Sequence, residues 1–525
     1  MAKNIFQAIA MPKIGSNMFD LSHDIKYSFR MGSLVPTTVM EVLPGDIVEI
    51  SVENMLRFTP LVAPVMHKID ATTHYFFVPN RILWPGWEDF ITRTDDATPP
   101  YLDNMSSMPE GSLADYMGVP TEMTDDAERI NALPFAAYCK IFDDYYRDQN
   151  LQSERFTPLL PGDNTTTYGF VASSAPFNRA WKHDYFTSAL PWAQKGDAVT
   201  LPLTNEQAVP VEMKDTWTSA EFVPTMRKPT GSLPTGTDVG NAVFIGPTTG
   251  EGLFGNSGST RLGYDPDGTL EVDINAEAVT INSLRLAVVA QRWLEKAARA
   301  GSRMKENILA FFGVNTSDAR LQRAEYIGGT KQRMAISEVL ATAQTAVDED
   351  VTPLGTMAGH GISLGGGNSF KYRAEEHGFI IGIINVQPDT AYQQGLHKMW
   401  SRETALEYAW PDFANLGEQE IKRKELYALA NNTVNNQTFG YIPRYSEYKY
   451  MNSRIAGEFR SSYNFWHMGR IFNAPPALNE DFIEANPTTR IFAVETGDHI
   501  LAHTYVNCRA VRKLPMHGIP GLTTI

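Results

Sequence analysis

Residues Glu375–Pro388 read EEHGFIIGIINVQP, and a strand formed at the centre of this short stretch would be apolar on both faces. One face would carry Phe379, Ile381 and Ile383, and the other Ile380, Ile384 and Val386. A strand with two apolar faces is covered on both sides, and a run this short cannot cross a bilayer. We therefore expect the rest of the chain to place strands beside it and layers above and below it.

Composition narrows the class of protein. The chain has 525 residues, of which 43% are hydrophobic and 20% charged, so a sizeable core is available. The net charge of -15 argues against a freely diffusing protein that coats DNA, although it leaves room for a local basic surface. Only two cysteines occur, Cys139 and Cys508, which excludes a disulfide framework and fits a reducing compartment.

Targeting signals are not visible in the sequence. The first residues, MAKNIFQAIAMPKIG, lack the apolar centre of a signal peptide, and no run is long enough for a transmembrane helix. We expect a chain that is made and folded in a cytosol, without a membrane partner. No phosphate-binding loop, dinucleotide fingerprint or C-x-x-C pair is present, so we expect no cofactor.

Three further segments show the period of two that is typical of strands. Pro36–Phe58 reads as a hairpin, because Pro44-Gly45 suits the centre of a type II turn. Lys68–Pro79 and Gly497–Leu514 follow the same alternation. In the last segment the inward positions are Ile500, Ala502, Thr504, Val506, Cys508 and Ala510.

Helices are predicted in two places. The first begins at Pro134 and places Cys139 on its apolar stripe, which favours a core residue over a nucleophile. The second covers about Ser283–Ala300, with a buried stripe that includes Leu286, Val289 and Trp293. Between them, Thr167–Trp192 is predicted to hold a short strand and an aromatic-rich loop.

The domain organisation follows from shifts in composition. Residues 1–195 are expected to hold an N-terminal arm and the first strands, and 366–525 the remaining strands with a long insertion at about 389–496. Residues 196–273 are dense in Gly, Pro, Thr and Ser and read as a projecting insertion that carries recognition. Residues 274–365 are expected to form a helical and loop insertion.

Two basic groups are candidates for contacts with nucleic-acid phosphates. Four cations would line one face of the second helix if it continues, at Arg292, Lys296, Arg299 and Arg303. A second group ends the last strand, at Arg509, Arg512 and Lys513, and could meet a single strand by charge and stacking. Solvated faces, or faces docked on acidic neighbours, explain the same patterns without a ligand.

Patterns that resemble catalytic or metal sites have simpler explanations. Gly361–Gly365 matches G-x-S-x-G, but a glycine-rich loop precedes it and no helix follows, as an esterase elbow requires. His499 and His503 are four residues apart on a strand, not on a helix, so they do not form a zinc pair. Asp265–Gly268 suits a tight turn better than a calcium loop. We therefore predict no catalytic and no metal-binding residue.

Long segments in the same order resemble the major capsid protein of the Microviridae, and within them the gokushoviruses. They are LSHDIKYSFRMGSLVPTTVMEVLPGD, LRFTPLVAPVMHKIDATTHYFFVPNRILW, LEKAARAGSRMKENILAFFGVNTSDARLQRAEYIGG, GYIPRYSEYKY and CRAVRKLPMHGIPG, together with the EEHGF strand. The resemblance leaves mainly 196–273 unmatched. Ala324 stands where the pattern leads us to expect a proline.

The resemblance implies an all-β fold, a single eight-stranded viral jelly roll with long loop insertions that contain some helices. It also implies a structural, non-enzymatic protein of a bacteriophage virion, assembled in the bacterial cytoplasm. The chain would build a T=1 icosahedral shell of about 60 copies around a circular single-stranded DNA genome. Implied partners are an internal scaffolding protein, a DNA pilot protein, a small basic DNA-binding protein and a host surface receptor met by 196–273.

Two other classes of function stay open from the residues alone. A cytosolic β-rich polysaccharide hydrolase needs two carboxylates about 5–10 Å apart in a groove, and any of the 60 acidic residues could form such a pair. A glycan-binding sandwich would use 196–273 as its binding loop. Loss of one essential carboxylate would reveal the first, and deletion of 196–273 would abolish the only activity of the second.

Overall fold

The structure is a computed structural model that describes residues 15–94, 97–103, 105, 108–121, 129–197, 199, 281–340 and 357–517. Backbone pairs at 212–213, 226–227, 263–264 and 270–271 are also described. The chain divides into two compact units. The main unit contains Met1–Gly196 and Leu294–Ile525, and the second unit contains Asp197–Trp293.

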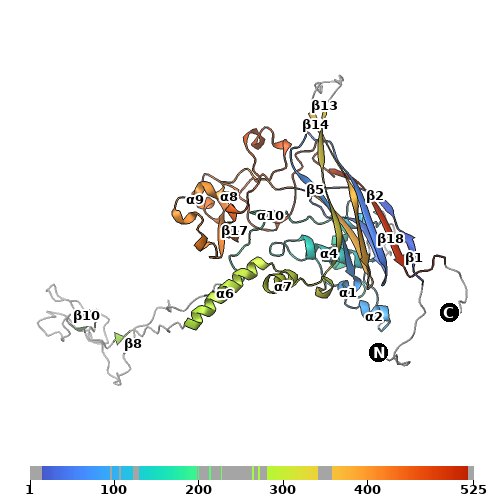
Figure 1. Ribbon diagram of the computed structural model, residues 1–525, viewed down its shortest axis with the longest axis horizontal. Helices are drawn as coiled ribbons and strands as arrows, with labels where there is room; N and C mark the ends of the chain where they lie inside the picture. The colour runs from blue at the N-terminus through green and yellow to red at the C-terminus, as the bar shows by residue number, and fades with distance from the viewer. Residues whose placement is uncertain are drawn as a thin grey trace, which may run out of the picture. The chain divides into compact units, whose positions relative to one another are not determined.

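Two antiparallel sheets form the centre of the main unit (Figure 1). The larger sheet has the order β1-β18-β4-β14-β13, and β2 also pairs with β18. Its strands are β1 (Asn17–Asp20), β2 (His23–Phe29), β4 (Ile47–Phe58), β13 (Ala335–Leu340), β14 (Met357–Arg373) and β18 (Ile500–Arg512). The smaller sheet has the order β12-β5-β15-β3. Its strands are β3 (Val35–Val42), β5 (Ile69–Pro79), β12 (Glu325–Arg333) and β15 (Gly378–Pro388).

The stretch around β15 has the central place that its sequence predicts. All of its residues from Gly378 to Pro388 are buried, and it pairs with β5 on one side and β3 on the other. Ile380 and Ile384 face the space between the sheets, where they join clusters that include residues of β4 and β18. Phe379 and Ile381 join a different cluster, built with the helices outside the sheet. The two-sided burial is confirmed.

Alternation along β18 is also confirmed. Its inward positions are all buried, namely Ile500, Ala502, Thr504, Val506, Cys508 and Ala510. The turn between β3 and β4 has Gly45 at φ 92°, the positive angle that the predicted type II turn needs. The main unit is therefore a strand-rich antiparallel structure in which two sheets pack face to face, as in a β-sandwich.

Glycines in β14 allow close packing against β4 and the loop that follows it. A Cβ on Gly359 would lie 2.5 Å from the Ala63 carbonyl oxygen, and a Cβ on Gly361 would lie 2.3 Å from the Phe58 ring. The register of β14 against β4 shifts between Gly366 and Ser369, next to Gly367 at φ 106°. The glycine-rich sequence therefore forms a bulged strand, and the G-x-S-x-G match lies inside it.

Helices cover the outer face of the smaller sheet. They include α1 (Asn80–Leu83), α4 (Leu133–Ile141), which continues as the π-helix η1 (Phe142–Tyr146), and α5 (Thr165–Ser173). Cys139 is buried in α4, as expected. The strand predicted from Thr167 is wrong, because this segment forms α5 and buries Tyr168 against α4. Shorter elements nearby are α2 (Trp87–Thr92), α3 (Leu113–Tyr116), β6 (Tyr101–Leu102) and β7 (Ile130–Asn131).

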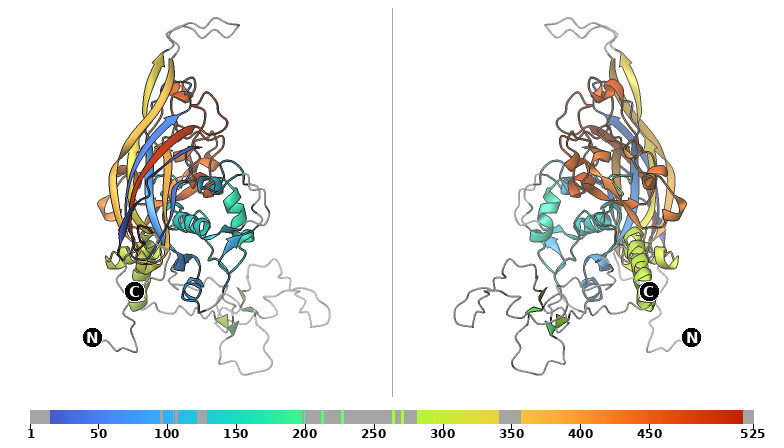
Figure 2. Two further views of the ribbon diagram at one scale, coloured as in Figure 1. Left: turned by 90° about the vertical axis from the view of Figure 1, so that its right-hand side faces the viewer. Right: turned by 90° about the vertical axis from the view of Figure 1, so that its left-hand side faces the viewer.

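The long segment between β15 and β18 forms a separate layer with its own apolar cluster (Figures 1 and 2). It contains β16 (Glu418–Lys422), β17 (Thr438–Pro443), α8 (Arg423–Leu426), α9 (Asn432–Asn435) and α10 (Glu480–Ile483). Short 3-10 helices complete it at Lys398–Ser401, Ala405–Glu407, Pro411–Phe413, Ser446–Tyr448, Gly457–Arg460 and Asn464–Trp466. Elsewhere α7 spans Met304–Phe312 and a 3-10 turn spans Ala319–Leu321.

The N-terminal stretch differs from the extended arm expected there. From Asn17 onward it forms β1 and β2, which pair with the two halves of β18. Both are edge strands with partly exposed side chains, so their sequences lack the strong alternation that identifies a half-buried strand.

The second unit contains two short antiparallel pairs among its described residues. They are β8 (Glu212–Met213) with β11 (Leu270–Glu271), and β9 (Met226–Arg227) with β10 (Gly263–Tyr264). Helix α6 (Ile281–Ala300) begins in this unit and ends in the main unit. Its predicted buried stripe is wrong, because Leu286, Val289 and Trp293 are 70%, 62% and 58% exposed. Most of the 196–273 insertion, and Asp265–Gly268, lie outside the described residues.

Candidate assembly surfaces and nucleic-acid contacts

One surface of the main unit gathers large apolar side chains around a hollow of about 410 Å³. We call these side chains the aromatic rim, and they are Leu396, Met399, Trp400, Tyr450 and Met451. All five are exposed, Trp400 and Met451 by 69% and 71%. Exposed apolar patches of this kind mark protein–protein contacts, in which Trp, Tyr and Met are enriched.

The floor of this hollow consists of side chains that are held by packing and by a hydrogen bond. Tyr185 and Phe186 belong to the apolar cluster of the 389–496 layer, and the Tyr185 hydroxyl donates to Glu425 Oε2 at 2.9 Å. Burial raises the pKa of the Glu425 carboxyl, although the Lys422 backbone N–H opposes this effect. A firm floor below exposed side chains suits a preformed contact surface.

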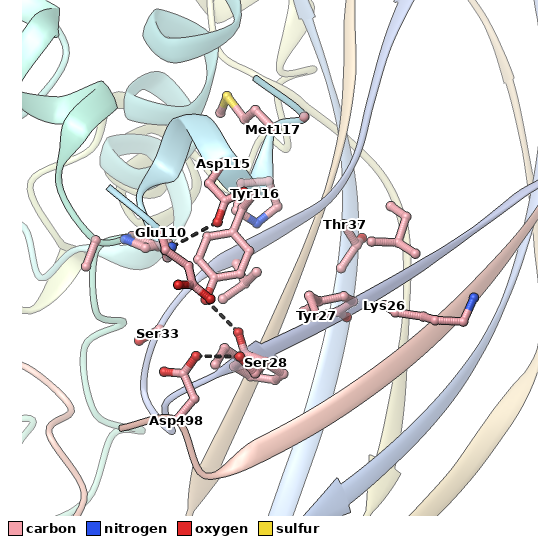
Figure 3. Close-up of a pocket in the computed structure, with 18 of the residues that line it drawn as sticks. Lys26, Tyr27, Ser28, Ser33, Thr37, Glu110, Asp115, Tyr116, Met117 and Asp498 are labelled. Carbon is pink, nitrogen blue, oxygen red and sulfur yellow. Dashed lines mark hydrogen bonds between the residues drawn. The ribbon is translucent and has the colours of Figure 1, made fainter. Parts of the chain in front are cut away.

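A larger cavity, of about 920 Å³, lies between the open edges of the two sheets (Figure 3). Among the described strands, β2 and β3 each pair with a single neighbour, and both contribute residues to the cavity. Helix α3 closes one end, where the Tyr116 hydroxyl donates to the Ser28 carbonyl oxygen at 2.6 Å and Ser28 Oγ donates to Asp498 at 2.7 Å (Figure 3). Strand edges with unpaired backbone groups are sites where another chain can pair.

The basic group at the end of β18 is balanced by acids of its own chain. Arg512 forms an ion pair with buried Asp46 at 3.0 Å and donates to the Glu41 carbonyl oxygen at 2.8 Å. Arg509 is exposed, and its register partners on the two neighbouring strands are Asp20 and Glu49. Lys513 is exposed beyond the strand.

The predicted stripe at the end of α6 does not form one free face. Arg292 is exposed in the second unit, whereas Lys296 lies 4.7 Å from the centroid of the Phe311 ring. Arg299 forms an ion pair with Glu418. Arg303 is half-buried and donates to two backbone carbonyl oxygens of the Asp143–Arg147 segment.

Arg299 and Arg303 nevertheless line a common cavity with cations that the sequence patterns missed. The cavity has a volume of about 560 Å³, and its other basic side chains are Arg147, Arg179 and Lys182. Arg147 follows the π-helix η1, whereas Arg179 and Lys182 share the loop after α5, so no recognisable spacing links the three. The one signal in the sequence was an aromatic residue directly before a cation in each segment, Tyr146 before Arg147 and Trp181 before Lys182. Both aromatic residues line the same cavity.

The other sequence motifs have structural roles. Ser363 is buried on β14, and its hydroxyl donates to the Arg333 carbonyl oxygen at 2.9 Å. His499 is buried and contacts the Val494 carbonyl oxygen, whereas His503 is partly exposed and pairs with Asp24. Within the described residues no group of three His, Cys, Asp or Glu side chains could hold a metal ion. Among those residues, too, no helix is long and apolar enough to span a membrane.

The β-sandwich, its exposed apolar rim and its open strand edges define a structural protein that associates with other chains. Comparison with known proteins identifies the class further. Residues 8–522 match the family described as "Capsid protein (F protein)", and the chain belongs to this family. The resemblance to gokushovirus capsid proteins of the Microviridae is thereby confirmed, and the protein is a major capsid protein located in the virion.

Three relatives match nearly the whole chain, and each is named capsid protein VP1. The protein of Chlamydia phage 1 is 35% identical, and the match covers 100% of this chain and 98% of the relative. That of Bdellovibrio phage phiMH2K is 36% identical, with coverage of 96% and 95%. That of Spiroplasma virus 4 is 28% identical, also with coverage of 96% and 95%.

Proposed function

We propose that the chain builds a T=1 icosahedral shell of about 60 copies around a circular single-stranded DNA genome. The observation that carries this proposal is the aromatic rim, whose large apolar side chains stay exposed to water in an isolated subunit. In a shell each rim would bury against a neighbouring copy, and closure of the shell would multiply many weak contacts. The open edges of β2 and β3 offer a second contact surface.

We also propose that the sandwich is an eight-stranded viral jelly roll. The supporting observation is the order of the strands, β2-β18-β4-β14 in one sheet and β3-β15-β5-β12 in the other. Along the chain these eight strands alternate between the sheets, except that β5 and β12 are neighbours in the smaller sheet, and this arrangement fits two Greek keys. The layer formed by 389–496 would then be an insertion between the last two jelly-roll strands.

The remaining assignments concern partners. We propose that 196–273 forms a surface protrusion that contacts the host receptor. The helical part of 274–365, which precedes β12, would connect it along the chain to the sandwich. Scaffolding, DNA pilot and small basic DNA-binding proteins would act with the chain in the bacterial cytoplasm, where the shell assembles. We infer a non-enzymatic role, supported by the buried structural position of Ser363 in the single esterase-like motif.

The test uses particles purified from infected bacteria. Nuclease added to intact particles should leave the nucleic acid whole, and opened particles should yield DNA that a single-strand-specific endonuclease degrades and an exonuclease does not. The mass of intact particles should match about 60 subunits plus the enclosed DNA. Double-stranded or linear DNA, or an assembly of a different size, would contradict this form of the proposal.

A further inference from the structure

A group of cations surrounds one buried carboxylate at the end of the smaller sheet. Asp70 on β5 is 3% exposed, and four basic side chains lie within 4.0 Å of it. They are Lys68 at 3.7 Å, Lys182 at 3.0 Å, Lys331 at 2.9 Å and Arg333 at 4.0 Å. A second carboxylate, Asp389, contacts only Lys68 and Lys182 in this group. Four positive charges therefore face two negative ones.

Arg179 adds a fifth cation beside this group. Its Nη1 atom donates to Thr72 Oγ1 at 3.4 Å, and Thr72 is two residues from Asp70 on the same face of β5. The guanidinium also lies 5.5 Å from the centroid of the Tyr146 ring. Among the described residues no carboxylate lies within ion-pair distance of Arg179. A cation held without a counter-ion in a partly desolvated place favours the arrival of an anion.

Arg179 and Lys182 line the 560 Å³ cavity described above. Burial lowers the pKa of Arg179. The exposed ends of the group, Lys331 and Arg333, are 59% and 66% exposed and extend the positive region to the surface. Tyr145 and Trp181 add aromatic faces to the cavity wall.

We propose that this place, centred on Arg179 and Lys182, binds phosphate groups of single-stranded nucleic acid. Lys182, Lys331 and Arg333 would attract the backbone from the surface, and Arg179 would pair with a phosphate in the cavity. Bases next to that phosphate could stack on the aromatic wall. The inference rests on the proposed enclosure of single-stranded DNA. It is centred on two residues outside the predicted basic groups, although Arg299 and Arg303 of those groups line the same cavity.

The test measures binding of a single-stranded oligonucleotide to the unassembled full-length chain over a series of salt concentrations. Arg179→Gln should weaken binding by about 3- to 10-fold at low salt. It should also lower the slope of log affinity against log salt by about 0.7, as expected for one lost phosphate contact on a single strand. Arg57→Gln is the matched control, because Arg57 is exposed on β4 of the other sheet and belongs neither to the cavity lining nor to the cations around Asp70. It should leave both quantities unchanged.

Arg179→Lys separates charge from packing. It keeps the positive charge, so it should bind within about threefold of the natural chain and keep its salt slope. The proposal is overturned if Arg179→Gln binds like Arg57→Gln, or if a folded Arg179→Lys chain is as weak as Arg179→Gln. Inorganic polyphosphate should compete with the oligonucleotide. Binding of polyphosphate by a chain that binds no oligonucleotide would contradict a nucleic-acid site. Shells that form normally in these variants would leave the assembly proposal intact, whichever way the binding result falls.

Discussion

Asn54 on β4 donates a hydrogen bond from Nδ2 to Thr73 Oγ1 on β5 at 3.0 Å, so a polar side chain links the two sheets inside the sandwich. Both residues are buried, and Asn54 Oδ1 accepts a second bond from Thr504 Oγ1 at 2.8 Å. Buried amides and hydroxyls are stable in a core only when they are paired. This link fixes how the sheets sit on each other.

Replacing Asn54 by Ala should therefore destabilise the subunit. The variant leaves the Thr73 hydroxyl without this donor and the Thr504 hydroxyl with only the Tyr27 hydroxyl, at a cost of about 1–3 kcal/mol in the free energy of unfolding. Denaturant titration of the unassembled chain measures this cost. Asn507→Ala is the control, since Asn507 is exposed on β18 and its loss should change stability by less than about 0.5 kcal/mol. Equal effects of the two variants would refute the structural role of the link.

Acid should weaken the chain at Asp70. Burial acts to raise the pKa of this carboxyl, but hydrogen bonds from Lys331 and Lys182 outweigh burial and hold the pKa at about 2. The folded pKa is lower than the unfolded one, so the stabilisation is complete above about pH 5 and is lost as the pH falls from about 4 to 2. It amounts to about 2 kcal/mol.

Denaturant titrations of the natural chain and of Asp70→Asn, at a series of pH values, test this prediction. The variant should be less stable than the natural chain at pH 7, because four cations lose their carboxylate, and the difference should shrink below about pH 4. A difference in stability that stays constant across this range would show that Asp70 is not held ionised by its neighbours.

Trp400 should matter for assembly and not for the fold of the subunit. Its side chain is 69% exposed on the aromatic rim, so Trp400→Lys removes no buried contact. If the rim is a subunit contact, the substitution should lower the assembled fraction at least tenfold, because aromatic side chains at interface centres contribute about 2 kcal/mol or more. Phe170→Lys is the control, with 81% exposure on α5 outside the rim. Normal assembly of Trp400→Lys chains would exclude the rim as a contact.

Gly359 should not tolerate a side chain. The Cβ of an alanine there would lie 2.5 Å from the backbone oxygen of Ala63, which cannot rotate away as a side chain would. We expect Gly359→Ala to lower the free energy of unfolding by about 1–3 kcal/mol, the usual cost of overpacking. Gly15→Ala meets no atom within 4 Å and should be close to neutral. A neutral Gly359→Ala would mean that β14 does not approach the Ala63 backbone so closely.

Strands with clear alternation were predictable from the sequence, and β5, β15 and β18 are examples. Their buried faces are continuous in sequence, so a local pattern is enough to find them. The segment TTTYGFVAS was not predictable, because its threonines, tyrosine and valine favour strands, yet packing of Tyr168 against α4 makes it helical. The resemblance to capsid proteins supplied the class of protein, which no single motif could.

The candidate sites were less accessible to prediction. Arg512 looks free in the sequence, but its partner Asp46 is more than four hundred residues away and meets it only through the pairing of β4 with β18. Arg179 and Lys182 do not look like part of a basic cluster in the sequence. Lys331 and Arg333 join Lys182 around Asp70 because β12 pairs with β5 in one particular register. Such clusters depend on tertiary contacts that spacing along the chain does not encode.

Sedimentation velocity combined with electron microscopy of the purified protein shows whether this chain forms closed shells. We expect uniform closed particles with a mass many times that of the 58.5 kDa subunit. These particles should reform when dissociated subunits are returned to assembly conditions. A homogeneous 58.5 kDa monomer under every assembly condition tried, with and without single-stranded DNA, would contradict the account.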